Sequence, residues 1–207
     1  MKKVLIHGSG HKAISWNKTI KYINYDNVLC PELSLILGGK GASYDNLYAL
    51  FSKYCNDIEG KIDLCGLSLG GILALNYALD FPNKVNSLIL IGTPHQVPKF
   101  MFSIQNVIFK FLPKSLFEDM AFNKKDTFIL GNSMKKLDFS DKVSKIKCQT
   151  LIICGEKDKA NIKSAYYLSK NIKGSKLEII KNTGHIVNEE NPKELALLIN
   201  NFWKYVC

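Results

Sequence analysis

The hydrophobic positions of the chain form short apolar runs that alternate with longer segments of helical spacing. The apolar runs predict β-strands, and several contain so few polar residues that we expect them to be buried on both faces, as parallel strands are. They lie at residues 3–6, 27–30, 62–65, 87–91, 150–154 and 177–180. The segments of helical spacing lie at residues 15–23, 44–55, 71–81, 162–172 and 192–205. This alternation is typical of an α/β domain with a mostly parallel sheet.

One long stretch interrupts the alternation, from Gln96 to Lys147. It contains no strong strand pattern, it is rich in Phe, Met and Lys, and Pro98 and Pro113 divide it. A loop of this length without secondary structure is uncommon in a compact domain. We therefore predict a helical insertion at residues 96–147, within a single domain that spans residues 1–207.

The charge of the chain changes this picture little. The formal net charge is +10, and all 28 basic residues are lysines, because the sequence contains no arginine. The lysines are spread along the chain, which favours a compositional bias over selection for an acidic partner. A protein that binds nucleic acid usually concentrates its charge and uses Arg for bidentate contacts, so this class is disfavoured.

The cysteines and the apolar runs indicate a cytoplasmic protein. Six cysteines are present, without a C-x-x-C pair or a Cys/His metal spacing, so we expect reduced thiols and no metal site. The apolar run near the N-terminus, Val4–Ile6, is shorter than the roughly 7–15 residues of a signal-peptide core. No apolar stretch approaches the roughly 20 residues of a membrane span.

A glycine-rich turn carries the strongest chemical signal. The sequence Gly66-Leu67-Ser68-Leu69-Gly70-Gly71 follows the strand predicted at 62–65 and opens the next helix. Serine on such a sharp turn exposes its hydroxyl, the flanking glycines allow backbones to approach closely, and the helix N-terminus favours negative charge. We expect Ser68 to be a catalytic nucleophile.

The base and the acid that such a serine needs follow two other strands. His185 comes after the strand predicted at 177–180, and Asp158 comes after the strand predicted at 150–154. The carboxyl ends of parallel strands share one edge of a sheet, so the three side chains should meet there. The chain order Ser, Asp, His is the order that is general for α/β-hydrolases. We therefore predict a triad of Ser68, Asp158 and His185.

Other residues compete for these roles less well. Glu156 is the alternative acid, and His95 is the strongest alternative base, but His95 would leave Asp158 without a role. We expect His7 to brace the loop after the first strand. Asp63 is expected to sit in or beside its strand for reasons of solvation.

The turn after the first strand, His7-Gly8-Ser9-Gly10, predicts an oxyanion hole. Small residues there let backbone N–H groups face a substrate oxygen. The donors would be the N–H groups of Ser9 and Leu69, and Gly10 is an alternative donor. Losing one such donor typically costs about 100–1000-fold in rate.

The chain resembles the α/β-hydrolase superfamily, specifically its small, lid-bearing, carboxylesterase-like branch. The resemblance rests on HGSGH, GLSLGG, LILIGTPH, LIICGEKD, NTGH and NPKELALLINNFW. It implies about six strands flanked by helices, with the insertion as a lid, and the triad named above. The sequence departs from the family in two ways. It lacks the leading antiparallel strands, and residues 31–41 lack the family's Asp-x-x-Gly-x-Gly-x-Ser stretch.

These features predict a serine hydrolase that cleaves carboxylic esters of a small or medium acyl group, with no cofactor. Lysines of the insertion raise an alternative, an acyl group carried on CoA or acyl carrier protein. A C–C bond hydrolase would use the same triad. A non-catalytic binding protein of the same fold would normally lack a triad member.

Overall fold

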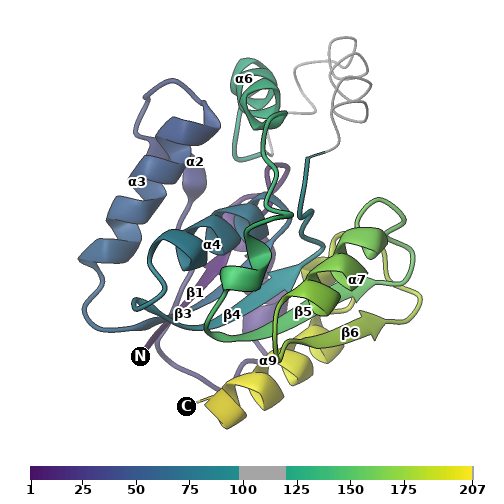
Figure 1. Cartoon of the computed structure of the whole chain (residues 1–207). Helices are drawn as coiled ribbons and strands as arrows, with labels where there is room; N and C mark the ends of the chain where they lie inside the picture. The colour runs from purple at the N-terminus through teal and green to yellow at the C-terminus, as the bar shows by residue number, and fades with distance from the viewer. Residues whose placement is uncertain (98–119, 207) are drawn as a thin grey trace.

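A six-stranded sheet lies between two layers of helices (Figure 1), in a computed structural model that describes residues 1–97 and 120–206. The strand order is β2-β1-β3-β4-β5-β6, and every neighbouring pair is parallel. The strands are β1 (Lys2–Ile6), β2 (Val28–Leu29), β3 (Ile62–Leu67), β4 (Val85–Ile91), β5 (Gln149–Gly155) and β6 (Lys176–Ile180). The prediction of a parallel sheet of about six strands is confirmed.

The strands alternate their side chains between two apolar layers. In β1, Val4 and Ile6 belong to one core cluster and Leu5 to the other. The central strand β3 is buried at all six positions. This explains why the strands appear in the sequence as continuous apolar runs, because both faces of the sheet are covered by helices.

The helices divide between these layers according to where their apolar faces pack. Helices α3 (Tyr44–Asp57), α4 (Leu69–Asp80) and α7 (Ile162–Asn171) contribute to the cluster that includes Val4 and Ile6. Helix α9 (Pro192–Val206) packs on the opposite face, where Leu195, Ile199 and Trp203 are fully buried. The remaining short elements are η1 (Ala13–Trp16), α1 (Asn17–Ile20), α2 (Leu33–Leu37) and α8 (Val187–Glu190).

The described part of the predicted insertion is helical. It contains α6 (Lys124–Met134) and the short η3 (Val143–Lys145). Gln96, at the start of the insertion, forms an antiparallel bridge with Asp138, which brings the two sides of residues 97–137 together there. The aromatic residues, Pro98 and Pro113 of the segment 98–119 lie outside the described residues. That the insertion covers a site as a lid, and that it belongs to one domain of residues 1–207, remain predictions.

Several short elements differ from the expectation, among them α8, a four-residue helix that was not predicted. The helix predicted at residues 15–23 is a 3-10 turn, η1, followed by a single α-helical turn, α1. Helix α2 was not predicted, because only five residues separate its start from the left-handed Gly38 that ends it. Periodicity over so few residues does not distinguish a helical turn from a loop.

A buried ion pair lies at the amino ends of the central strands. Lys3 Nζ is 2.9 Å from Asp63 Oδ2, and the two side chains are 3% and 0% exposed. Ser87 Oγ donates to the other carboxylate oxygen at 2.6 Å, and the Lys3 ammonium lies over the rings of Tyr25 and Trp203. The expectation that solvation explains Asp63 is wrong: Asp63 lies in its strand because buried partners satisfy its charge.

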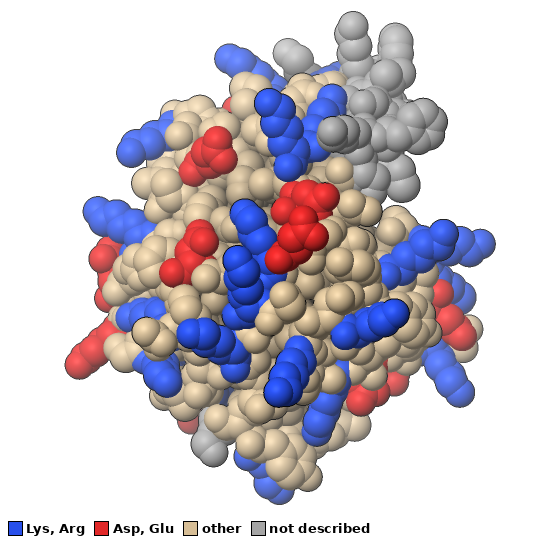
Figure 2. Space-filling model, viewed as in Figure 1, with Lys and Arg blue, Asp and Glu red and all other residues tan. Residues whose placement is uncertain are grey.

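Lysines are spread over the visible surface (Figure 2), and the described cysteines are free thiols. Figure 2 shows lysines scattered over the visible face with acidic side chains among them, without a single basic block there. Cys30, Cys55, Cys65, Cys148 and Cys154 are free thiols, and Cys207 lies outside the described residues. Within the two described ranges, no helix is long and apolar enough to cross a membrane.

Candidate active site

Ser68 lies on a strained turn between β3 and α4. Its backbone has φ 54° and ψ −113°, a conformation that residues other than glycine rarely adopt. Ser68 N donates to the carbonyl of Ile91 at 2.9 Å, which ties the turn to the end of the neighbouring strand β4. Strain of this kind persists only where the surroundings impose it, and it is concentrated at functional sites.

The glycine at position 70 is required by close packing. A Cβ at Gly70 would lie 2.2 Å from the carbonyl oxygen of Ile6, which is far inside van der Waals contact. The absence of a side chain therefore lets the start of α4 rest on the end of β1. The expected reason for the glycines around Ser68, close backbone approach, agrees with this geometry.

Asp158 and His185 form a hydrogen-bonded pair at the same edge of the sheet. His185 Nδ1 lies 2.6 Å from Asp158 Oδ2, and the carboxylate side chain is 3% exposed while the imidazole is 37% exposed. Asp158 follows β5 and His185 follows β6, as the sequence predicted. Because Nδ1 of His185 is bound to Asp158, Nε2 is the ring nitrogen that can act on another group.

The pair lies beside the Ser68 turn. Gly92, the residue after Ile91, has φ 51°, and a Cβ there would be 3.0 Å from His185 Nδ1 and 3.1 Å from Asp158 Oδ2. Because Ile91 holds the backbone of Ser68, the serine and the pair flank the same end of β4. The hydrogen bonds of the described residues do not include one between Ser68 and His185, so the structure joins two of the three predicted groups directly.

Asn161 is a site residue that sequence reasoning missed. Its side-chain Nδ2 lies 3.0 Å from each oxygen of Asp158, and its backbone N donates to Oδ1 at 3.2 Å. The signal was the spacing Asp-x-x-Asn at a helix start, where an acceptor side chain satisfies free N–H groups.

The ionisation of Asp158 follows from these contacts. Burial acts to raise the pKa of Asp158, but the hydrogen bond and charge of His185 and the donors of Asn161 outweigh burial and lower it. The carboxylate is therefore ionised throughout the neutral range. An ionised acid orients the imidazole and stabilises it when it takes up a proton.

The loop that carries His185 is held by two carboxylates. Glu190 accepts from the backbone N of Gly184 at 2.6 Å and from that of Ile186 at 3.1 Å, on either side of His185. Glu156, the alternative acid of the sequence analysis, accepts from Asn182 N at 2.8 Å. Glu156 is thus engaged with the loop backbone, and the imidazole is bound by Asp158.

The predicted oxyanion donors lie on two turns that meet at Ser68. Leu69 begins α4, and Ser9 follows Gly8 on the turn after β1. A Cβ at Gly8 would be 3.5 Å from Ser68 Cβ, so this turn lies against the serine. The turn is closed by His11 N, which donates to the Gly8 carbonyl at 3.2 Å.

His7 and His95 have structural contacts. His7 Nδ1 donates to the Gly8 carbonyl at 2.8 Å, and His7 Nε2 accepts from Leu33 N at 3.0 Å, so His7 braces the loop as expected. His95 Nδ1 is 2.9 Å from Ser164 Oγ, and its ring stacks on Tyr167 at 4.0 Å between centroids. Burial lowers the pKa of both rings. In residues 1–97 and 120–206, no three His, Cys, Asp or Glu side chains are grouped as a metal would require.

Comparisons with known proteins agree with this fold. Residues 4–196 match the model of the alpha/beta hydrolase family. The chain is 24% identical to monoacylglycerol lipase ABHD6 of Mus musculus, covering 96% of this chain and 74% of that protein. It is 27% identical to a 2-hydroxy-6-oxononadienedioate/2-hydroxy-6-oxononatrienedioate hydrolase of Escherichia coli, covering 96% and 85%. The enol-lactonase of Burkholderia xenovorans superposes with a TM-score of 0.80 at 15% identity, covering 98% and 91%.

The chain belongs to the alpha/beta hydrolase family, and it is a hydrolytic enzyme. The resemblance stated from the sequence motifs is confirmed at the level of the family.

Proposed function

We propose that the protein is a serine esterase that cleaves carboxylic esters of a small or medium acyl group. The observation that carries the proposal is the strained Ser68 turn beside the hydrogen-bonded pair of His185 and Asp158. These are the nucleophile, base and orienting acid that acyl transfer to water requires. The substrate would be a small molecule.

The reaction would proceed in two halves through an acyl-enzyme. His185 Nε2 takes the proton of Ser68 Oγ while the oxygen attacks the ester carbonyl, and His185 then gives that proton to the leaving alcohol. Water attacks the acyl-enzyme by the same route and releases the acid. Asp158 accepts a hydrogen bond from His185 Nδ1 throughout and stabilises the imidazolium.

The negative charge of the tetrahedral intermediate would be met at the Ser68 turn. The N–H groups of Leu69 and Ser9 are the proposed donors, with Gly10 as the alternative to Ser9. The start of α4 adds the favourable potential of a helix N-terminus. Fixed donors of this kind stabilise the transition state because they need no reorganisation during the reaction.

The test compares the wild-type protein with Ser68→Ala on p-nitrophenyl esters. We expect kcat to fall at least about a thousandfold, since a triad without its nucleophile retains only the effect of its oxyanion donors. A fluorophosphonate probe should label the wild-type protein at Ser68 and leave the variant unlabelled. Full turnover by Ser68→Ala would exclude the mechanism.

A C–C bond hydrolase is the second candidate, favoured by the likeness to the Escherichia coli hydrolase over 85% of that protein. Both reactions use the same three groups, so the discrimination rests on the substrate. A panel of esters, thioesters and a vinylogous diketone, compared by kcat/KM, would separate the candidates. An acidic acyl carrier as partner remains a prediction, and several of the lysines that suggested it lie outside the described residues.

A further inference from the structure

A second histidine lies next to the proposed nucleophile and has no role in the mechanism above. His11 Nδ1 lies 3.4 Å from the position that a Cβ on Gly8 would occupy, and Ser68 Cβ lies 3.5 Å from the same position. The ring of His11 and the side chain of Ser68 therefore flank the same glycine. Glu189, His185 and His7 lie close enough for their charges to act on the pKa of His11.

The two nitrogens of His11 have different surroundings. Nδ1 is buried and has no hydrogen-bond partner among residues 1–97 and 120–206. Burial lowers the pKa of His11, so the ring is neutral at pH 7 and carries one proton. A buried N–H without an acceptor is costly, so the proton belongs on Nε2 and the free lone pair on Nδ1.

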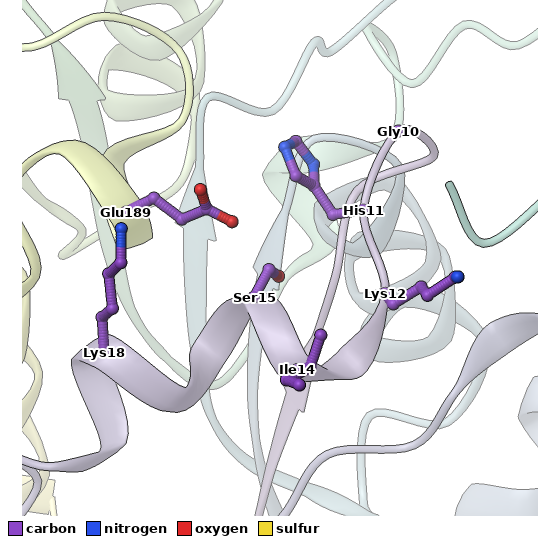
Figure 3. A pocket seen from close by; sticks show the side chains of 7 residues that line it. All are labelled: Gly10, His11, Lys12, Ile14, Ser15, Lys18 and Glu189. Carbon is purple, nitrogen blue, oxygen red and sulfur yellow. The ribbon is translucent and has the colours of Figure 1, made fainter. Parts of the chain in front are cut away.

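The exposed part of His11 lines a cavity of about 320 Å³ (Figure 3). The cavity is bordered by Lys12, Ile14, Lys18 and Glu189, and Figure 3 shows the His11 ring between the Glu189 carboxylate and Gly10. Since Nδ1 is buried, the ring nitrogen that the cavity can reach is Nε2. A hydrogen-bond donor thus lies at the junction of the Ser68 turn and this cavity.

We infer that this cavity binds a hydroxyl-bearing alcohol arm of the ester, and that His11 Nε2–H donates a hydrogen bond to an oxygen of that arm. The cavity carries ammonium groups, a carboxylate and a neutral imidazole, so it offers both donors and acceptors. A hydroxyl group uses both, with its oxygen toward His11 and its proton toward Glu189. An alkyl arm would make neither the contact with the His11 N–H nor the one with the Glu189 carboxylate, which is how polar sites reject apolar analogues.

The inference rests on the proposed ester hydrolysis at Ser68, and the experiment keeps the two apart. The probe is a set of butyrate esters with the same acyl group: ethyl, 2-hydroxyethyl and carboxymethyl. The variants are His11→Leu, which removes the donor, and His11→Gln, which places an amide near the position of Nε2. Ile14→Ala, which changes an apolar wall of the same cavity, is the matched control.

We expect the wild-type enzyme to prefer the 2-hydroxyethyl ester to the ethyl ester in kcat/KM. His11→Leu should lower that preference about five- to tenfold, the usual worth of one neutral hydrogen bond. His11→Gln should restore part of it, and Ile14→Ala should retain it. Thermal unfolding of each variant shows that the fold is kept.

Two results would overturn the inference while leaving the proposed function intact. One is an unchanged preference in His11→Leu while fluorophosphonate still labels Ser68. The other is a preference for the carboxymethyl ester that disappears in His11→Leu, because the arm would then be anionic. Failure of the probe to label Ser68 in the wild-type protein would instead remove the proposed function itself.

Discussion

The side chain of Asn161 supports Asp158 without taking part in proton transfer. Its amide binds both carboxylate oxygens and so restricts the rotation of the group that orients His185. We expect Asn161→Ala to lower kcat/KM for p-nitrophenyl esters about ten- to a hundredfold, the effect of losing a hydrogen bond to a charged group.

The same change should alter the protonation of Asp158. Asn161 helps to lower the pKa of Asp158, so its removal raises that pKa. A carboxylate is ionised above its pKa, so the Asp158 carboxyl, followed by NMR, should take up its proton at higher pH in Asn161→Ala. Asn171→Ala, at the other end of the same helix, is the control, because the Asn171 side chain donates to the Tyr167 carbonyl. An Asp158 protonation curve that does not move in Asn161→Ala would contradict the role.

The sequence predicted which polar residues follow the ends of the strands, but it did not predict Asn161. Ser68, Asp158 and His185 each follow a strong apolar run, and strand ends converge because the strands are parallel. Asn161 lies at the start of a helix, where asparagine is common for reasons of capping alone. The Asp-x-x-Asn spacing fits such a cap, so it does not by itself mark Asn161 as a residue of the site.

At the scale of elements, the loop between β6 and α8 positions the imidazole of His185. Glu190 binds the N–H groups on both sides of His185, so it acts on the histidine through the backbone. We expect Glu190→Gln to lower kcat about tenfold with little change in KM, because a neutral amide accepts less strongly than a carboxylate. Steady-state kinetics on a p-nitrophenyl ester would measure both constants.

The matched control is Glu178→Gln, an exposed glutamate of the preceding strand β6. It removes one negative charge from the same region without touching the loop. Should both variants lose activity equally, the effect would be one of general charge. A positioning role requires that Glu190→Gln alone lowers kcat.

The long elements were predictable because their patterns extend over several turns or over a buried strand. Helix α9 begins at Pro192 and buries Leu195, Ile199 and Phe202, which is the spacing visible in the sequence. The strand predicted at 27–30 is present as the two-residue β2, whereas the five-residue α2 is too short to have a period, so packing decides its form. Propensity alone is a weak guide in such segments.

At the scale of the whole molecule, the Lys3–Asp63 pair should matter for stability and little for catalysis. Lys3→Met would leave the Asp63 carboxylate buried without its cation, and breaking a buried pair on one side typically costs about 3–5 kcal/mol. Urea unfolding would measure the loss, and Lys2→Met, at the exposed neighbouring residue, should change little. The kcat of the folded variant should stay within about twofold, since roughly 16 Å of strand separates Asp63 from Ser68.

The pH dependence of stability should follow from three histidines. Burial lowers the pKa of His7, His11 and His95 in the folded chain. The unfolded chain therefore binds protons more readily as pH falls through the ordinary range near 6.5, and folding stability is lost in that direction. Above that range the stability is fully present.

We expect the free energy of unfolding to decrease as the pH is lowered from 7.5 to 5.5. Each proton bound only by the unfolded chain contributes about 1.4 kcal/mol per pH unit at most. His7→Gln should flatten this dependence, since His7 is fully buried. A stability that rises toward pH 5.5 would contradict the prediction.

The parallel sheet also has a consequence for how such an enzyme can change over generations. The ion pair that anchors the central strands lies at their amino ends, and the reacting groups lie at their carboxyl ends. Mutations in the loops at the carboxyl ends therefore leave the anchor untouched. Where such mutations spare closely packed positions such as Gly70, the specificity of the site can change while the fold is kept.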